Sequence, residues 1–150
     1  MKRRIAVYTI QEVFDLIKVN NVVWKGNPRV GRLLNMNVTL HDFKVKLNSD
    51  RYEVFIKKGI KCSECGLEGS FFALETSKAD EKVQRAHFNL YAIKEDKEIL
   101  MTKDHIVAYN LGGQDFIDNY RTLCSQCNGI KGSIEQKIIE RKGVQNENYK

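Results

Sequence analysis

The four cysteines are the feature that most constrains the fold of this sequence. They form two Cys-x-x-Cys pairs, Cys62 with Cys65 and Cys124 with Cys127, and no cysteine lies outside them. Two such pairs supply four thiolates, the ligand set that closes a tetrahedral shell around a structural Zn²⁺. The 58 residues between the pairs would then form one closed loop. Because closure costs free energy only logarithmically with loop length, this separation is compatible with a shared zinc site.

Another use of the cysteines stays open at this point. One pair could be a redox dithiol while the other is buried, which predicts easily oxidised thiols and no bound zinc. The N-terminus is basic, but Glu12 interrupts its apolar run and no small-residue cleavage site follows, so we read no signal peptide and expect a cytoplasmic protein. That compartment disfavours disulfides and therefore favours the zinc hypothesis. No run of about 18 apolar residues is present, so no membrane partner is expected.

Positive charge is concentrated in the first 58 residues, which hold 12 Lys and Arg against five Asp and Glu. Residues 59–150 hold 13 against 14. A basic segment suits binding to a phosphate backbone, because each neutralised phosphate releases counterions. The alternative is that these side chains simply solvate an exposed face. We predict that residues 1–58 form a basic extension that positions nucleic acid, with contacts that include Arg29, Arg32, Lys57 and Lys58.

Hydrophobic periodicity and capping residues predict the secondary structure. Thr9 and Glu12 have capping-box spacing at the start of a helix of about three turns. Strands are favoured by β-branched and aromatic residues, and helices by apolar residues at intervals of three and four. The further expected elements are a short helix over 48–59, a hairpin of strands over 71–74 and 86–93, strands over 100–109 and 116–123 around a glycine turn, and helices over 125–132 and 133–143.

The residues from Asp104 to Lys131 carry the candidate chemistry. Asp104 offers a hard oxygen ligand, Asn128 offers an amide oxygen, and a neutral imidazole at His105 can accept a proton from water. Together they predict metal-assisted phosphodiester hydrolysis with Mg²⁺, or with Mn²⁺ or Ni²⁺ in its place. Lys131 lies three residues after Asn128, where helical spacing would let it contact a phosphate, although it is equally compatible with a solvated position.

Asp104 and His105 are neighbours, and this places a condition on the site. In a regular strand their side chains would point to opposite faces. Both can serve one site only if the strand is twisted, bulged or ending at that point, so the sequence predicts such an irregularity.

Two segments, KCSECG and KDHIVAYNLGGQDFIDNYRTLCSQCNGIKG, resemble the HNH endonuclease family, also called His-Me finger or ββα-metal nucleases. The resemblance consists of the Asp-His pair, the double glycine, an asparagine 14 residues after His105 and another nine residues later. It implies that Asp104 and Asn128 bind the catalytic divalent ion, that His105 is the general base, and that Asn119 buttresses the loop holding His105. The family commonly has histidine where Asn128 stands, and its minimal members have a shorter segment before Asp104.

These observations predict an α+β fold with three parts. Residues 1–58 would form the basic N-terminal helical extension, residues 59–133 a ββα-metal core with a four-cysteine zinc knuckle and a β-hairpin insertion, and residues 134–150 a C-terminal helix and tail. The predicted function is a metal-dependent endonuclease that nicks or cuts double-stranded DNA, similar to small phage or free-standing homing endonucleases. A phage-encoded protein of this kind would act in the host-cell cytoplasm. The alternative is a non-catalytic zinc-knuckle protein that binds nucleic acid.

Overall fold

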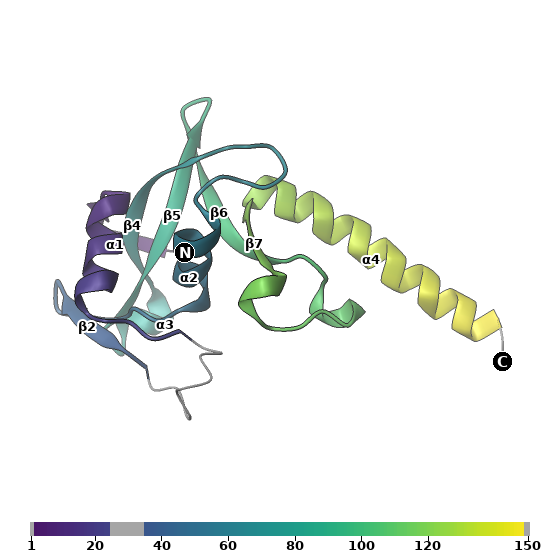
Figure 1. Ribbon diagram of the computed structural model, residues 1–150, viewed down its shortest axis with the longest axis horizontal. Helices are drawn as coiled ribbons and strands as arrows, with labels where there is room; N and C mark the ends of the chain where they lie inside the picture. The colour runs from purple at the N-terminus through teal and green to yellow at the C-terminus, as the bar shows by residue number, and fades with distance from the viewer. Residues whose placement is uncertain (1, 25–34, 149–150) are drawn as a thin grey trace.

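The computed structural model describes residues 2–24 and 35–148, with side chains through residue 141. The predicted contacts Arg29 and Arg32 lie outside the described residues. Among the described residues, no helix combines the length and the apolar character needed to span a bilayer. The architecture is mixed, with helices packed on a β-sheet (Figure 1), in agreement with the predicted combination of helices and strands.

A seven-stranded sheet forms the framework. Its strands are β1 (Lys2–Tyr8), β2 (Asn37–Leu40), β3 (Phe43–Lys46), β4 (Gly69–Ser77), β5 (Arg85–Lys94), β6 (Lys97–His105) and β7 (Tyr120–Cys124). The order is β1-β4-β5-β3-β2, while β6 pairs with β5 and with β7. Only the β3–β5 pair is parallel among the pairs of named strands. The predicted hairpin of β4 and β5 is confirmed, with the short helix α3 (Lys78–Glu81) in its connection.

Along one edge, strand β5 pairs first with β3 and then with β6, and the Tyr52 side chain contacts the stretch of β5 between these two pairings. It pairs with β3 at Arg85 and Ala86 and with β6 from Tyr91 onward. Between these segments, the Tyr52 hydroxyl accepts a hydrogen bond from the Phe88 N–H at 2.9 Å and lies 3.4 Å from the Phe88 carbonyl oxygen. The hydroxyl therefore satisfies backbone groups that no neighbouring strand reaches.

Strand β1 was not expected from the sequence. It pairs antiparallel with β4, and its first three residues are exposed, so it lacks the alternation of apolar and polar residues that marks a strand. Through β1 and β3, the basic first third of the chain joins the same sheet as β4 and β5. The division after residue 58 is therefore not a break in the sheet, and it remains a hypothesis about function.

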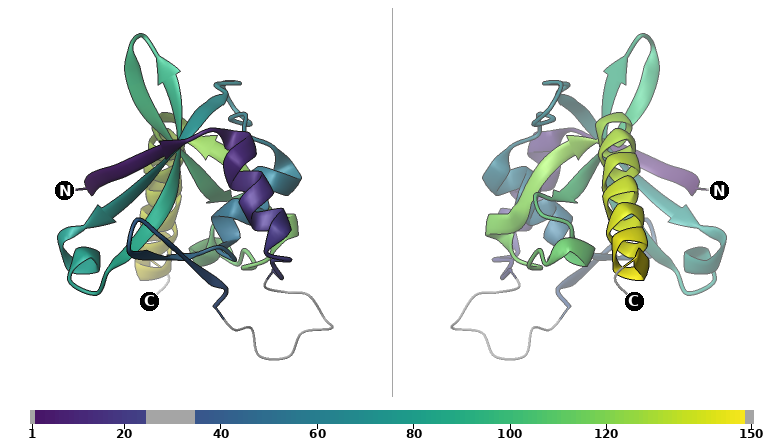
Figure 2. Two further views of the ribbon diagram at one scale, coloured as in Figure 1. Left: turned by 90° about the vertical axis from the view of Figure 1, so that its left-hand side faces the viewer. Right: turned by 90° about the vertical axis from the view of Figure 1, so that its right-hand side faces the viewer.

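Two helices cover one face of the sheet and enclose the core. They are α1 (Ile10–Val19) and α2 (Asp50–Lys58), and Figure 2 shows them side by side against the strands. Their side chains pack with Phe72 and Phe88 in one buried cluster. The predicted capping box of α1 is confirmed, since Thr9 and Glu12 exchange both hydrogen bonds. The predicted end of α2 at Gly59 is also confirmed, with that glycine at φ +96°.

The C-terminal part departs from the prediction in two ways. The strand predicted over 100–109 ends at His105, and Tyr109–Leu111 and Ile117–Asn119 are single turns of 3₁₀ helix. The two helices predicted over 125–132 and 133–143 are one helix, α4 (Ser125–Asn148), which projects from the sheet in Figure 1. Ser133 does not cap a second helix, because its hydroxyl donates to the Gly129 carbonyl one turn earlier at 3.1 Å. Gly143 does not end the helix either.

Candidate functional site: a cysteine cluster beside a polar hairpin

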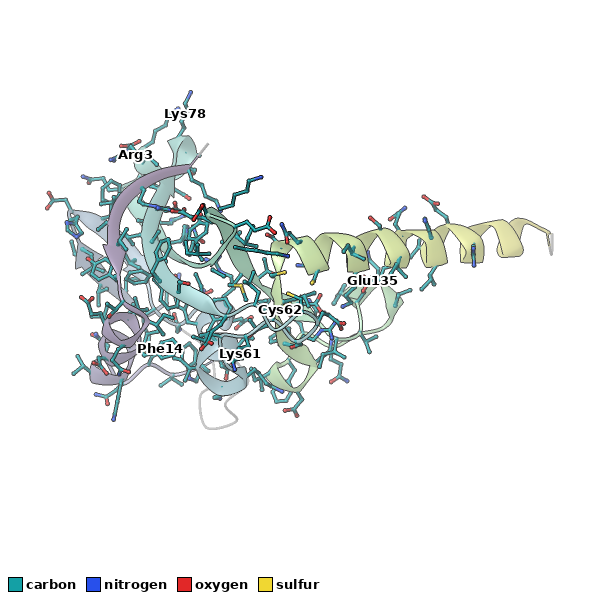
Figure 3. The ribbon with its side chains drawn as sticks, turned by 90° about the horizontal axis from the view of Figure 1, so that it is seen from above. Arg3, Phe14, Lys61, Cys62, Lys78 and Glu135 are labelled. Carbon is teal, nitrogen blue, oxygen red and sulfur yellow. The ribbon has the colours of Figure 1, made fainter. Side chains whose placement is uncertain are left out.

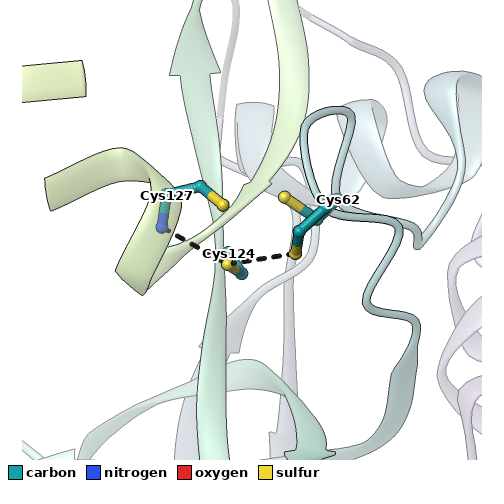
Figure 4. Close-up of side chains that lie close together, drawn as sticks. Cys62, Cys124 and Cys127 are labelled. Atoms are coloured by element: carbon teal, nitrogen blue, oxygen red, sulfur yellow. Dashed lines mark hydrogen bonds between the residues drawn. The ribbon is translucent and has the colours of Figure 1, made fainter. Parts of the chain in front are cut away.

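The four cysteines lie together, as the zinc hypothesis requires. Their sulfur atoms are all within 4.8 Å of one another, and the Sγ atoms of Cys65 and Cys124 are 3.9 Å apart (Figure 4). A tetrahedral shell with Zn–S distances of about 2.3 Å places its sulfurs about 3.8 Å apart. The arrangement therefore fits a four-thiolate metal site.

Backbone contacts position the two cysteine pairs. The first pair is on a turn closed by the Cys62 N–H to the Leu67 carbonyl at 2.8 Å. The Ser63 N–H donates to the carbonyl of Thr122 in β7 at 2.9 Å, which fastens this turn to the strand that leads into the second pair. Cys124 ends β7, and the N–H of Cys127 in the first turn of α4 donates to its sulfur at 3.4 Å. The sheet thus closes the loop between the pairs.

The thiols have unequal acidity. Burial acts to raise the pKa of Cys62, but backbone hydrogen bonds involving Cys124, Cys65 and Glu64 oppose it, and the pKa is lowered to about 6. Burial and hydrogen bonds with the other cysteines raise the pKa of Cys127 to about 12. Because the pKa values of Cys124 and Cys127 are raised, ionisation of these two thiols calls for a bound cation, and binding would release protons.

Asp104 is 6% exposed, and its carboxylate accepts three hydrogen bonds from two cationic side chains. Its Oδ2 accepts from Arg121 Nε at 2.9 Å, and its two oxygens accept from Lys131 Nζ at 3.0 and 2.9 Å. The same ammonium group donates to the backbone carbonyl of His105 and lies 3.1 Å from Glu135 Oε1. We call Asp104, Arg121, Lys131 and Glu135 the Asp104 cluster. Figure 3 shows Glu135 along α4, whose start lies near Cys62.

Asn128 lies on the same side of the hairpin as Asp104. Its Nδ2 donates to the Thr102 hydroxyl at 3.0 Å, and Thr102 precedes Asp104 by two residues in β6, so both face α4. A carboxylate and an amide oxygen suit a hard divalent ion in chemical kind. In this arrangement, however, the carboxylate oxygens already contact Arg121 and Lys131.

His105 faces the opposite side. Its Nε2 lies 3.1 Å from Asp115 Oδ1, and its ring meets the Tyr120 ring edge-on at 4.9 Å. The Tyr120 hydroxyl donates to the same Asp115 oxygen. Lys103 Nζ, on this face of β6, lies 4.4 Å from the Tyr120 ring centroid and 3.8 Å from Asp50 of α2. This face of the hairpin is therefore directed toward α2.

The β6–β7 register is continuous through the pairs Asp104–Arg121 and His105–Tyr120. The predicted irregularity consists of the end of the strand at His105, without a bulge. Regular alternation therefore directs the two neighbouring side chains to opposite faces. The structure brings Asp104 and Asn128 to one face and leaves His105 on the other.

Asn119 holds the loop that joins β6 to β7. Its side chain accepts from the Val107 N–H at 2.9 Å and donates to the carbonyls of Val107 and Gln114 at 3.0 and 2.7 Å. Its backbone carbonyl accepts from Ile106 at 2.7 Å. These bonds tie the residues that follow His105 to the start of β7.

Sequence reasoning missed Arg121, Tyr120, Asp115 and Glu135. Antiparallel pairing across the loop would have placed Arg121 opposite Asp104 and Tyr120 opposite His105. The spacing of Glu135 four residues after Lys131 is a known signal for a helical ion pair. Asp115 carried no such signal, because its contact depends on the fold of the loop.

The predicted nucleic-acid contacts fall in different environments. Lys57 Nζ lies 2.7 Å from Glu53 Oε2 one turn earlier in α2, and Lys58 is exposed at the end of that helix. Lys131 is engaged in the Asp104 cluster, and it is not the solvated side chain that the alternative assumed. Its side chain is 20% exposed.

Comparison with known proteins gives one family. Residues 91–142, about a third of the chain, match the family model described as HNH endonuclease. The segment includes β6, β7, Asp104, His105 and Asn128, and the match confirms the predicted resemblance. It indicates nuclease activity, and with it a nucleic-acid substrate and a divalent metal. Neither the curated proteins nor the solved structures gave a match.

Proposed function

We propose that this chain, with its HNH endonuclease segment, is a metal-dependent enzyme that hydrolyses phosphodiester bonds in DNA. The observation that carries the proposal is the pair formed by His105 and Asp115 within the matched segment, at the exposed end of β6. A histidine oriented by a carboxylate is the arrangement of a general base.

The contact with Asp115 decides which ring nitrogen of His105 reacts. When Nε2–H donates to Asp115, Nδ1 carries the lone pair. Nδ1 then takes the proton of the attacking water, and the Asp115 carboxylate stabilises the imidazolium that results. The His105 side chain is 27% exposed, so water reaches it. Asn119 would fix the loop in which this pair lies.

Asp104 and Asn128 would hold the catalytic cation, Mg²⁺ or, in its place, Mn²⁺ or Ni²⁺. When bound, this ion supplies positive charge to the scissile phosphate and its leaving oxygen. His105 must turn toward the Asp104 face for the two parts to act on one phosphate. Such a turn would open the last pair of the β6–β7 ladder, because β6 ends at His105, and Asp115 would have to move with the ring to keep their contact.

The cysteine cluster would support the fold, and the basic N-terminal residues would bind the DNA. The four cysteines would hold a structural Zn²⁺ with no open position for chemistry. The basic residues 1–58, including Arg29, Arg32, Lys57 and Lys58, would contact the phosphates of double-stranded DNA outside the cleavage site. This organisation suits a small phage-encoded or homing nuclease that acts in the cytoplasm.

A specific observation favours a second function. Both oxygens of Asp104 are engaged by cationic side chains, and His105 faces away from them. These contacts suit a non-catalytic zinc-knuckle protein that binds nucleic acid and retains the HNH residues without using them.

Plasmid cleavage distinguishes the two functions. Supercoiled DNA incubated with the protein and Mg²⁺ should be nicked or linearised, and His105→Ala should slow cleavage by about 100-fold or more. DNA binding and zinc content should be retained in that variant. His87→Ala is the matched control, because His87 contacts Asp80 outside the matched segment. If wild type and His105→Ala give equal products with Mg²⁺, Mn²⁺ and Ni²⁺, the binding function replaces the enzymatic one.

A further inference from the structure

We propose that Lys131 is the resident cation of the Asp104 cluster, and that a divalent ion binds there only when the lysine ammonium leaves. This inference rests on the proposed function for the placement of the ion at Asp104. It adds a regulatory role for Lys131 that links ion binding to phosphate binding.

The surroundings of the Lys131 ammonium are those of a cation site. Four oxygens from three residues surround it: both carboxylate oxygens of Asp104, Oε1 of Glu135 and the backbone carbonyl of His105. Carboxylate and carbonyl oxygens are the ligands that hard divalent ions take in proteins. The ammonium therefore occupies the Asp104 oxygens that the ion of the proposed function needs.

Lys131 and an ion cannot share Asp104. The ammonium lies 3.0 and 2.9 Å from the two carboxylate oxygens, so an ion bound to both of them would take its position, whereas Arg121 contacts Oδ2 alone. The Asp104 side chain is only 7% exposed, so solvent would screen the repulsion between the ammonium and the ion poorly. The measured ion affinity is then the intrinsic affinity reduced by the fraction of molecules in which Lys131 is displaced. Arg121 would stay on Oδ2, since its guanidinium is also held by Glu64 at 2.8 Å.

The displaced ammonium has space and a new partner. A cavity of about 370 Å³ adjoins it, lined by residues that include Arg121, Ile134 and Glu135. Lysine has a flexible four-carbon stem, so the freed charge can move into this space without movement of α4. The cavity is also lined by Glu64 and by apolar side chains, so the DNA phosphate that attracts the ammonium would lie at its mouth and not inside it. Phosphate and divalent ion should therefore each strengthen the binding of the other.

The test measures Mn²⁺ binding, without cleavage, on protein whose cysteine cluster has been saturated with Zn²⁺. Free Mn²⁺ is followed by electron paramagnetic resonance in wild type, Lys131→Met, Asp104→Asn and the control Lys137→Met on the same helix. We expect Lys131→Met to bind Mn²⁺ about tenfold more tightly than wild type or more, and Lys137→Met to match wild type. Asp104→Asn should lose the site.

A second measurement uses the unaltered chain. The ammonium of Lys131 is observed by NMR while Mg²⁺ is added, and its signal should shift as it leaves the cluster. Equal or weaker Mn²⁺ binding in Lys131→Met, with loss in Asp104→Asn, overturns this inference and leaves the proposed ion site standing. Binding that is unchanged in Asp104→Asn overturns the ion site of the proposed function itself. An ammonium signal unmoved at saturating Mg²⁺ also overturns the inference.

Discussion

The two halves of the molecule share one apolar core, which includes Met101 of β6 and Leu123 of β7, but they differ in the contacts around it. Around β4 and β5, aromatic rings fill the core: Phe72 lies within 6.5 Å, centroid to centroid, of the rings of Tyr52, Phe55 and Phe88. Around β6, β7 and α4, the named contacts are mainly a cysteine cluster, ion pairs and the amide of Asn119. Apolar packing needs no added component, whereas clustered thiols and charges depend on ions and pH. The stability of the half formed by β6, β7 and α4 should therefore depend on bound metal and on pH.

Removal of a metal ion bound by the cysteine cluster should produce the largest effect. Binding of a structural Zn²⁺ by four thiolates is worth on the order of 10 kcal/mol, and this free energy is coupled to folding. Chelation, or Cys62→Ser, should abolish amide-exchange protection in β7 and the first turns of α4, with a smaller loss in β4 and β5. Hydrogen exchange with mass spectrometry measures both halves at once. Equal protection with and without chelator would remove the contrast between the halves.

A change in the aromatic core should destabilise both halves without depending on metal. Phe72→Ala removes a fully buried ring and should cost about 3–5 kcal/mol of unfolding free energy. Urea titration of zinc-saturated protein measures it. Phe116→Ala is the control, because Phe116 is 39% exposed, and it should change stability little. A loss confined to β4 and β5 would show that the halves unfold separately.

Asp115→Asn should affect catalysis more than stability. The amide keeps the shape of the side chain but removes the charge that would stabilise His105 as it takes a proton, so cleavage should slow by about 10- to 100-fold. Plasmid cleavage at several pH values measures the loss, and the urea midpoint checks the fold. Asp118→Asn, a change in the same loop, is the control. Cleavage at the wild-type rate in Asp115→Asn would remove Asp115 from the site.

The smallest expected effect concerns acid pH and the β4–β5 half. Burial, with the nearby charge of Arg51, lowers the pKa of His87 despite its contact with Asp80. The unfolded chain therefore takes up the proton first as pH falls, and stability is lost below the ordinary histidine pKa of about 6.5. His87→Gln should make the unfolding free energy fall less steeply between about pH 7 and 5. Thermal melts across this range test it against His41→Gln, and parallel curves would contradict it.

The sequence predicted elements whose signals are local. The helix from Ile10 and the end of α2 at Gly59 follow from a capping box and a glycine, both set by residues a few positions apart. Strand β1 was not predicted, because an exposed edge strand can form without alternating apolar and polar residues. The break predicted at Ser133 was wrong because its hydroxyl bonds within the helix instead of capping one.

The candidate site could be predicted in composition but not in arrangement. Spacing alone identified the cysteines that meet and the shared face of Asn128 and Lys131. The partner of Lys131 could not be predicted, because the contact between Lys131 and Asp104 joins helix α4 to strand β6 and depends on the tertiary fold. The direction of His105 depended on whether β6 kept its regular alternation up to its last residue, which long-range pairing with Tyr120 decides.

The position of the two cysteine pairs has a topological consequence. Strands β4, β5 and β6 all lie between Cys65 and Cys124. A metal ion bound by the four cysteines would therefore close the chain that contains these strands into a loop. A protease that cleaves the backbone at Tyr109, which is 71% exposed, would open this loop without releasing either fragment. The bound ion and the pairing of β6 with β7 would hold the two fragments together, and the fragments would separate only after the ion is removed.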